Sequence, residues 1–209
     1  LLATSLPETR PAAERVNSSV GSALAGYGKL LRDRHYLGLV LSGAFGMASF
    51  FAYLANSSFI MIDHYGLTPR EYSFTFSVNA AAFIGVSQFT GKLSQRFGLV
   101  KVVNMAVAGF AAVMGVLLLV NLAGVDRLDV LIALLFVGFG FLGLVVPTTA
   151  VLALEEHGEI AGTASALMGT IQFVVGALGM AVGGLFVDGS ARPLVVGIAG
   201  SAIAPSGCA

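Results

Sequence analysis

Five long apolar stretches account for most of the chain, and the charged residues lie between these stretches or at their ends. Each stretch reaches the roughly 20 residues that an α-helix needs to cross the hydrocarbon core of a bilayer. None contains Asp, Glu, Lys or Arg, as lipid requires, because an unpaired charge at bilayer depth is costly. The pattern predicts five membrane-spanning helices, over residues Leu37–Ile62, Tyr72–Gly91, Val102–Val125, Val130–Leu154 and Ile160–Val187.

A polar connector precedes the first stretch, and its second half, Val20–Tyr36, has the spacing of a short amphipathic helix. The apolar positions that recur on one helical face are Val20, Leu24, Tyr27 and Leu31. Three basic residues lie near the end of this helix, and basic amphipathic helices before a spanning helix often lie on the membrane surface. An ordinary linker is the alternative interpretation.

The two ends of the chain resemble pieces of further spanning helices. The chain begins with Leu-Leu-Ala-Thr-Ser-Leu and no initiator Met, and the apolar run at 193–204 is too short to cross a bilayer. We therefore expect a fragment of a longer protein with four parts. These are the end of a truncated spanning helix (1–6), a cytoplasmic connector (7–36), a five-helix membrane bundle (37–192), and a truncated last helix with its tail (193–209).

The distribution of Lys and Arg predicts the orientation of the bundle. If the gaps between stretches alternate sides, one side holds eight basic residues: Arg10, Arg15, Lys29, Arg32, Arg34, Lys92, Arg96 and Lys101. The other side holds three: Arg70, Arg127 and Arg192. Because cytoplasmic loops are enriched in Lys and Arg, the first side is predicted to face the cytoplasm.

Composition excludes several other classes of protein. The formal net charge is zero, so nothing favours nucleic acid as a partner. The single cysteine, Cys208, cannot form a disulfide framework. The three histidines are scattered and do not have the spacing of metal ligands. We expect no metal and no cofactor. The 27 glycines and the absence of Trp fit closely packed membrane helices.

One short motif, Gly91-Lys92-Leu93-Ser94-Gln95-Arg96-Phe97-Gly98, lies between the second and third stretches. It resembles the G-x-L-x-x-R-x-G loop signature of the major facilitator superfamily, in the form found in the carboxyl-terminal half. We expect Gly91 and Gly98 to permit a tight reversal, and Arg96 and Lys101 to reach helix carbonyls or acids on a neighbouring helix. The resemblance implies that these four residues form a conformational latch. A basic loop that only fixes topology is the alternative.

Further segments, in the same order, resemble the Bcr/CflA (bicyclomycin-resistance type) efflux proteins of this superfamily. Leu-Pro-Glu-Thr at 6–9 matches the end of their sixth helix, and 51–59 with 65–69 is similar to their seventh helix and following turn. Ser58 replaces a usual proline and removes an expected kink. Segments 147–153 and 161–173 resemble their tenth and eleventh helices. The resemblance implies an all-α polytopic membrane helix bundle, the carboxyl-terminal half of a major facilitator fold, with five complete spanning helices plus fragments.

In the implied fold, two halves face a central cavity near the bilayer midplane, so polar side chains on the cavity-facing helices are candidate substrate-binding residues. They are Tyr53, Asn56, Ser57, Asn79 and Gln172. Tyr53 and Asn56 are expected to share one helical face. An amide in lipid must find a partner, and both another helix and a substrate remain open as that partner. The apolar side chains that suit a drug pocket are Phe50, Phe51, Phe83, Met168 and Phe173.

The resemblance implies proton-coupled efflux of small hydrophobic compounds or drugs by alternating access, across a bacterial inner membrane. The implied partners are a small-molecule substrate, protons, the lipid bilayer and the missing amino-terminal half. That half is expected to carry the proton-coupling acid, because no carboxylate lies deep in these stretches. A non-transporting membrane subunit or an inactive remnant is the alternative. An embedded enzyme is disfavoured, because the stretches hold no Ser/His, HExxH or paired-carboxylate set.

Overall fold

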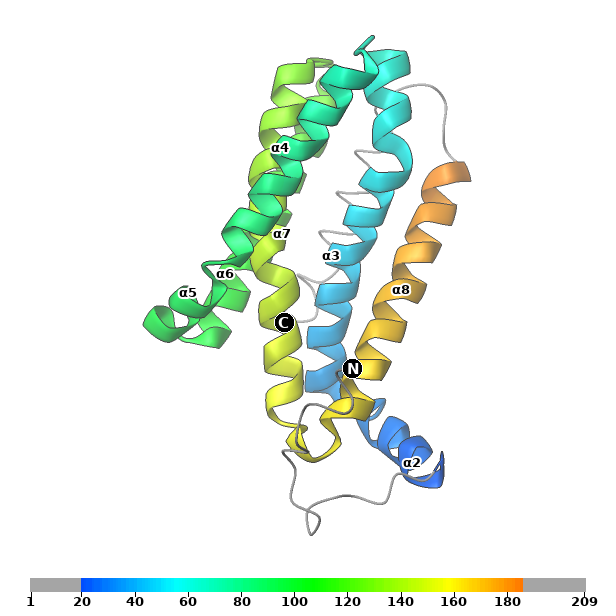
Figure 1. The fold of residues 1–209 in the computed structure, drawn as a ribbon, viewed down its shortest axis with the longest axis vertical. Helices are drawn as coiled ribbons and strands as arrows, with labels where there is room; N and C mark the ends of the chain where they lie inside the picture. Colours follow the sequence, from blue (N-terminus) through cyan, green and yellow to red (C-terminus); the bar gives the residue numbers. More distant parts are fainter. Residues whose placement is uncertain (1–19, 186–209) are drawn as a thin grey trace, which may run out of the picture.

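The computed structural model describes residues 20–185, and that part of the chain is entirely helical (Figure 1). Its elements are α2 (Val20–Leu30), α3 (Arg34–Phe59) with the π-helical continuation η2 (Ile60–His64), α4 (Pro69–Ser87), α5 (Thr90–Phe97), α6 (Leu99–Leu122), α7 (Leu128–Glu155), the 3-10 turn η3 (Gly158–Ile160) and α8 (Ala161–Leu185). The all-α class is confirmed. The helix fragments expected at 1–6 and 193–209 lie outside the described residues.

Within the described range, four helical segments are long and apolar enough to cross a membrane: Arg34–His64, Leu99–Leu122, Leu128–Glu155 and Gly158–Ala181. The helix in the second predicted stretch, α4, has only 19 residues and carries Arg70 and Glu71 in its first turn. It packs along α7 and completes the five-helix bundle (Figure 1). The predicted end of this stretch at Gly91 is wrong. The Ser87 hydroxyl and the Gln88 amide both donate to the Ile84 carbonyl, at 2.7 and 3.4 Å, where the helix ends.

Local side-chain chemistry sets the other helix boundaries. The Asp33 carboxylate accepts hydrogen bonds from the backbone N–H groups of His35 and Tyr36, at 2.9 and 3.1 Å, and so caps the start of α3. Thr68 and Glu71 form a reciprocal capping box at the start of α4, where Pro69 occupies the first turn. These caps fix where the first two long helices begin.

Consecutive long helices run in opposite directions (Figure 1). The α2–α3 turn and the α7–α8 loop therefore meet at one end, where the His157 Nε2 atom lies 3.2 Å from the Asp33 carboxylate. We call this the connector end. At the opposite end, the far end, His64 Nε2 lies 2.7 Å from a carboxylate oxygen of Asp126 in the α6–α7 loop. The predicted alternation of the gaps is confirmed for these segments.

Helix α7 is the centre of the bundle and packs against α3, α4 and α6, while α8 packs along the other side of α3 (Figure 1). Glycines allow the closest contacts. A Cβ atom at Gly143 would lie 2.3 Å from the backbone oxygen of Phe83 in α4. A Cβ atom at Gly176 would lie 2.2 Å from the Phe51 ring of α3. Both helix pairs therefore depend on the absence of a side chain at one position.

The apolar positions predicted for the connector helix do not all pack on the bundle, and a membrane-surface role for them stays a prediction. Leu24 and Leu31 are 63% and 52% exposed, whereas Leu30 is completely buried. Helix α2 docks on α8, where a Cβ atom at Gly26 would contact the Thr163 methyl group at 3.2 Å. The helix also ends at Leu30, so that Leu31 lies in the turn before α3. Packing on α8, rather than the i, i+4 spacing of the leucines, decides which face is buried.

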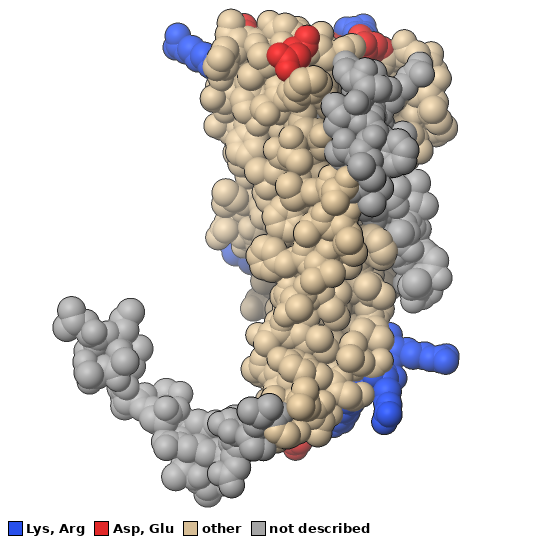
Figure 2. All heavy atoms as spheres, turned by 90° about the vertical axis from the view of Figure 1, so that its right-hand side faces the viewer, with Lys and Arg blue, Asp and Glu red and all other residues tan. Residues whose placement is uncertain are grey.

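Charged side chains lie mainly near the two ends of the bundle on the face shown in Figure 2, and the surface between them is largely uncharged. Large apolar side chains on the outer faces are exposed, among them Met105 and Leu119 of α6 and Leu178 of α8. A water-soluble bundle would carry polar residues at such positions, whereas hydrocarbon tails solvate them well.

Candidate functional site

A pocket with mainly aromatic walls lies between α3, α4 and α7. Its volume is about 230 Å³, and its lining residues are Phe50, Tyr53, Phe76, Asn79, Ala80, Phe83, Ile84 and Phe139. Phe50 stacks on Phe83 and Tyr53 stacks on Phe76, with ring centroids 5.9 and 5.8 Å apart. The Phe139 ring is inclined by 87° and 61° to the Phe50 and Tyr53 rings of α3, with centroids 6.0 and 4.8 Å away. We call this space the aromatic pocket.

Asn79 is the only amide in the lining of the aromatic pocket, and it is 1% exposed. Its Nδ2 atom donates a hydrogen bond to the Tyr53 hydroxyl at 3.1 Å. Its Oδ1 atom is buried and has no hydrogen-bond partner among the described residues. An amide oxygen left unpaired in an apolar setting costs about 1–3 kcal/mol. Both polar atoms of this side chain are buried behind the pocket surface, which is entirely apolar.

A second polar pair lies next to this one on the same two helices. The Ser57 hydroxyl of α3 and the Tyr72 hydroxyl of α4 are 3.1 Å apart, and Ser57 is completely buried. The structure thus brings three of the predicted substrate-binding residues, Tyr53, Ser57 and Asn79, to the α3–α4 contact. Ser57 has its partner within the bundle and does not line the aromatic pocket.

The other two predicted residues lie elsewhere. Asn56 is half-buried, and its Nδ2 atom donates to the Ala52 carbonyl of its own helix at 2.9 Å. Gln172 of α8 lies where α3 approaches: a Cβ atom at Gly43 would be 3.1 Å from Gln172 Nε2 and 2.9 Å from Thr149 Oγ1. Neither side chain lines the aromatic pocket, so the five predicted residues do not form one site.

The phenylalanines expected in a drug pocket divide in the same way. Phe50 and Phe83 do line the aromatic pocket, whereas the Phe51 ring packs against Phe173 between α3 and α8, at 5.8 Å. Phe76 and Phe139 also line the pocket and were not among the predicted residues. Phe76 lies seven residues before Phe83 on the same helix, and this two-turn spacing was a signal that could have identified it.

The predicted latch segment forms a helix instead of a loop. Gly91 lies in the first turn of α5 with no positive φ angle, so the expected role of Gly91 in a reversal is wrong. Gly98 does adopt the left-handed conformation, at φ 85°, and separates α5 from α6. The Arg96 guanidinium lies 5.3 Å from the centre of the Phe97 ring. Within residues 20–185, neither Arg96 nor Lys101 forms an ion pair.

A buried cluster at the connector end escaped the sequence analysis. His157 is 7% exposed, and its ring lies edge-on to Tyr36 with centroids 5.2 Å apart. The Tyr36 hydroxyl donates to the Ala164 carbonyl of α8 at 2.6 Å. Together with the contact between His157 and Asp33, this cluster joins the starts of α3 and α8 to the end of α7. Asp directly before an apolar stretch is a helix-start signal, but nothing in the sequence pattern connects it to His157.

The pKa of Asp33 is lowered from its ordinary value of 3.8, mainly by the Tyr36 backbone N–H and further by the His35 N–H and the nearby His157. We expect Asp33→Ala to destabilise the protein by about 1 kcal/mol near neutral pH, because the cap of α3 is lost. Asp33→Asn retains a capping oxygen and should lose less. A depressed folded-state pKa adds stability above the unfolded-state pKa, and this contribution disappears as pH falls through the folded-state value.

The difference in thermal stability between wild type and Asp33→Ala should therefore shrink as the pH falls below 3.8. Circular dichroism of the purified proteins in detergent, at a series of acidic pH values, measures this. A difference that stays constant over that range would show that the ionised carboxylate contributes nothing.

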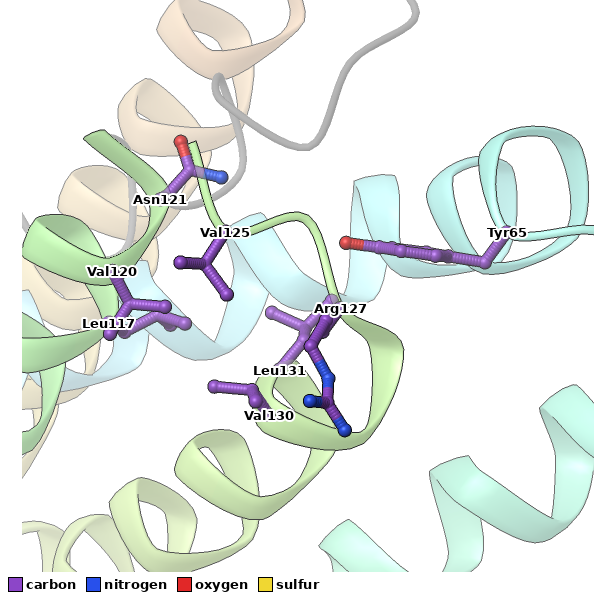
Figure 3. A pocket seen from close by; sticks show the side chains of 8 residues that line it. All are labelled: Tyr65, Leu117, Val120, Asn121, Val125, Arg127, Val130 and Leu131. Carbon is purple, nitrogen blue, oxygen red and sulfur yellow. The ribbon is translucent and has the colours of Figure 1, made fainter. Parts of the chain in front are cut away.

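Two other hollows lie toward the far end. One has a volume of about 10 Å³ and is shown in Figure 3. Its walls combine apolar side chains such as Leu117 and Val120 with the polar side chains of Tyr65, Asn121 and Arg127. It holds a single water at most. A wider depression of about 760 Å³ lies between the starts of α4 and α7, at the rim beside Arg70 and Glu71. Among the described residues, no group of three His, Cys, Asp or Glu could hold a metal ion.

Comparison with known proteins identifies relatives over most of the chain. The Major Facilitator Superfamily profile matches residues 1–180. The uncharacterized MFS-type transporter YdgK of Bacillus subtilis is 32% identical over 178 residues, which cover 85% of this chain and 44% of that protein. A bicyclomycin resistance protein homolog of Haemophilus influenzae is 24% identical over 202 residues, or 91% and 48% of the two chains. The chain spans about half the length of these curated relatives.

Proposed function

Because the chain belongs to the major facilitator superfamily, a family of membrane transporters, we propose that it is the carboxyl-terminal half of an exporter of small hydrophobic compounds. The chain aligns with about half the length of each relative, which supports the proposal that it is half of a transporter. The name of the Haemophilus relative supports drug export. In this proposal the bundle spans a bacterial inner membrane with its connector end in the cytoplasm, and transport proceeds by rocking of two halves around a midplane site.

The aromatic pocket is the observation that carries the proposal. Stacked rings from α3 and α4, together with the Phe139 ring of α7, offer apolar surface without any charged side chain. Such a surface favours compounds that leave water readily, and it discriminates weakly among apolar ligands of similar size. Both properties suit an exporter of hydrophobic compounds.

The residue that carries protons is expected in the other half of the transporter. Among the described residues, no buried side chain is Asp, Glu, Lys or Arg, and the buried histidine, His157, lies at the connector end away from the aromatic pocket. A group that carries protons through the bilayer must be ionisable and must reach the transport pathway. We therefore propose that the coupling acid lies in the amino-terminal half, and that this half closes the site.

The pocket is tested with Phe83→Ala in the full-length transporter. Efflux of N-phenyl-1-naphthylamine, a neutral fluorescent aromatic amine, is followed in cells with and without a proton gradient. Loss of one aromatic stacking partner, worth about 0.5–1.5 kcal/mol, should reduce efflux roughly threefold to tenfold. Phe74→Ala is the matched control, because Phe74 is on the same helix, is 72% exposed and does not line the pocket.

Expression of each variant in the membrane is measured alongside efflux. Equal efflux by wild type and Phe83→Ala would remove the aromatic pocket from the transport site. If cells with the wild-type protein do not export the amine, and the proton gradient does not change its level in the cells, the non-transporting subunit or inactive remnant is favoured.

A further inference from the structure

The buried histidine of the connector end, His157, has no part in the proposed transport site. We infer that it forms a pH-sensitive contact, which holds the start of α3 against the end of α7 while the imidazole is protonated and weakens when the proton is lost. The inference goes beyond the proposed function, because it concerns how two loops at this end are held together and not what the aromatic pocket binds.

Both nitrogen atoms of the His157 ring face oxygen atoms that only accept hydrogen bonds. The Nε2 atom lies 3.2 Å from the Asp33 carboxylate in the α2–α3 turn, and the Nδ1 atom lies 3.3 Å from the Ala153 carbonyl in the last turn of α7. Asp33 is ionised near neutral pH, because the backbone N–H groups of Tyr36 and His35 lower the pKa of its carboxyl. A neutral imidazole has one N–H, whereas the imidazolium donates from both nitrogens. Only the protonated ring therefore satisfies both oxygens.

The surroundings of the ring make its protonation state matter for packing. His157 is shielded from water, and the Tyr36 ring of α3 lies against it with centroids 5.2 Å apart. The carbonyl end of α7 favours a positive charge at this position. When the ring loses a proton, a nitrogen lone pair faces an oxygen lone pair, and little water is present to separate them. The ring then cannot keep both contacts, and the α2–α3 turn is held less firmly.

The other charged side chains at the connector end are less able to act in this way. His35 lies 3.5 Å from Glu156 and forms a second contact between the same two loops. Both of these side chains are more than half exposed, and exposed ion pairs contribute little to stability. Helix α8 has no charged side chain between Ala161 and Leu185. The remaining charged side chains near the two loops are exposed, namely Lys29, Arg32, Arg34, Glu155 and Glu159.

The direction of the pH response follows from which form of the ring makes both contacts. Histidine is the side chain whose charge changes between about pH 5 and pH 8. A contact that needs the protonated form is complete at the acidic end of this range and is lost as the pH rises. If the connector end faces the cytoplasm, as proposed above, a rise in cytoplasmic pH loosens the start of α3.

Hydrogen exchange of the full-length transporter in lipid nanodiscs tests the inference. The backbone amides of His35 and Tyr36 donate to the Asp33 carboxylate, so their protection reports whether the turn is held. Measured rates are divided by the intrinsic rate of each amide at the same pH. Between about pH 5.5 and pH 8, protection in wild type should fall roughly threefold to tenfold, between the values for an exposed ion pair and a buried charged hydrogen bond. In His157→Gln this fall should disappear.

Three further variants complete the test. Asp33→Asn retains a capping oxygen but has no carboxylate charge, so it should lose the pH response even if His157→Gln does not fold. His64→Gln removes a titratable ring at the far end and should respond as wild type does. Protection that does not change with pH in wild type, or a fall that survives in His157→Gln or Asp33→Asn, overturns the inference. A fall that disappears in His35→Gln instead assigns the response to the exposed pair and also overturns it. No substrate is used, so the outcome is independent of the proposed transport function.

Discussion

Replacing Gly143 with leucine is expected to destabilise the bundle strongly by forcing α4 and α7 apart. A Cβ atom there would lie 2.3 Å from the backbone oxygen of Phe83, far inside contact distance, and a backbone atom cannot rotate aside as a side chain does. Helices α4 and α7 would have to separate along their contact. Overpacking of this kind costs about 1–3 kcal/mol or more, against a net stability of roughly 5–15 kcal/mol for a typical domain.

Thermal unfolding in detergent should place Gly143→Leu well below wild type, and Gly143→Ala should fall between the two. Gly115→Leu in α6 is the matched control, because a Cβ atom at Gly115 meets nothing within 4 Å. Wild-type stability of Gly143→Leu would mean that α4 and α7 do not approach as closely as described. Since Phe83 lines the aromatic pocket, Gly143→Ala is also expected to weaken ligand binding there.

Arg96→Ala in the full-length transporter is expected to abolish most transport while leaving membrane insertion unchanged. Helix α5 has no buried residues, so the Arg96 charge contributes little to the packing of this half. The guanidinium has no carboxylate partner within residues 20–185 and lies only over the neighbouring Phe97 ring. We propose that it meets its partner in the other half of the transporter during one state of the cycle, as a conformational latch.

Lys92→Ala is the matched control for Arg96→Ala, because it removes the same charge from the same helix at an unspecified position of the G-x-L-x-x-R-x-G pattern. Efflux and membrane abundance are measured in parallel. Equal loss in both variants would indicate a general effect of basic charge on topology. Undiminished efflux in Arg96→Ala would reduce the motif to an orientation signal.

Tyr53 and Asn56 show that two residues on one helical face need not belong to the same binding site. Their spacing of three residues places them close together on α3. Yet Tyr53 is buried against Phe139 and Asn79, while Asn56 turns back to the Ala52 carbonyl of its own helix. An amide that satisfies itself locally needs no neighbour, and the sequence does not reveal which amides do so. Asn56 as a substrate contact remains a prediction.

The α4–α5 boundary illustrates the same limit at the level of secondary structure. An uncharged run through Gly91 predicted a longer spanning helix, because apolar composition marks what lipid tolerates rather than where a helix ends. The end at Ser87 depends on two side chains that compete for the Ile84 carbonyl. A hydropathy pattern does not predict helix boundaries that depend on such local hydrogen bonds.

The sequence by itself determined the membrane character, the helical class, the alternation of the loops and the family, because each depends on the order of apolar and polar residues and on short motifs along the chain. The tertiary structure alone decided which side chains meet. It brought Phe76 and Phe139 to Phe50, Tyr53 and Asn79, and joined Asp33 to His157 across 124 positions of the chain. Helices that are apolar on all sides give no signal of which face meets which neighbour. Close approaches such as the one at Gly143 make that choice, and they appear only when the helices are packed.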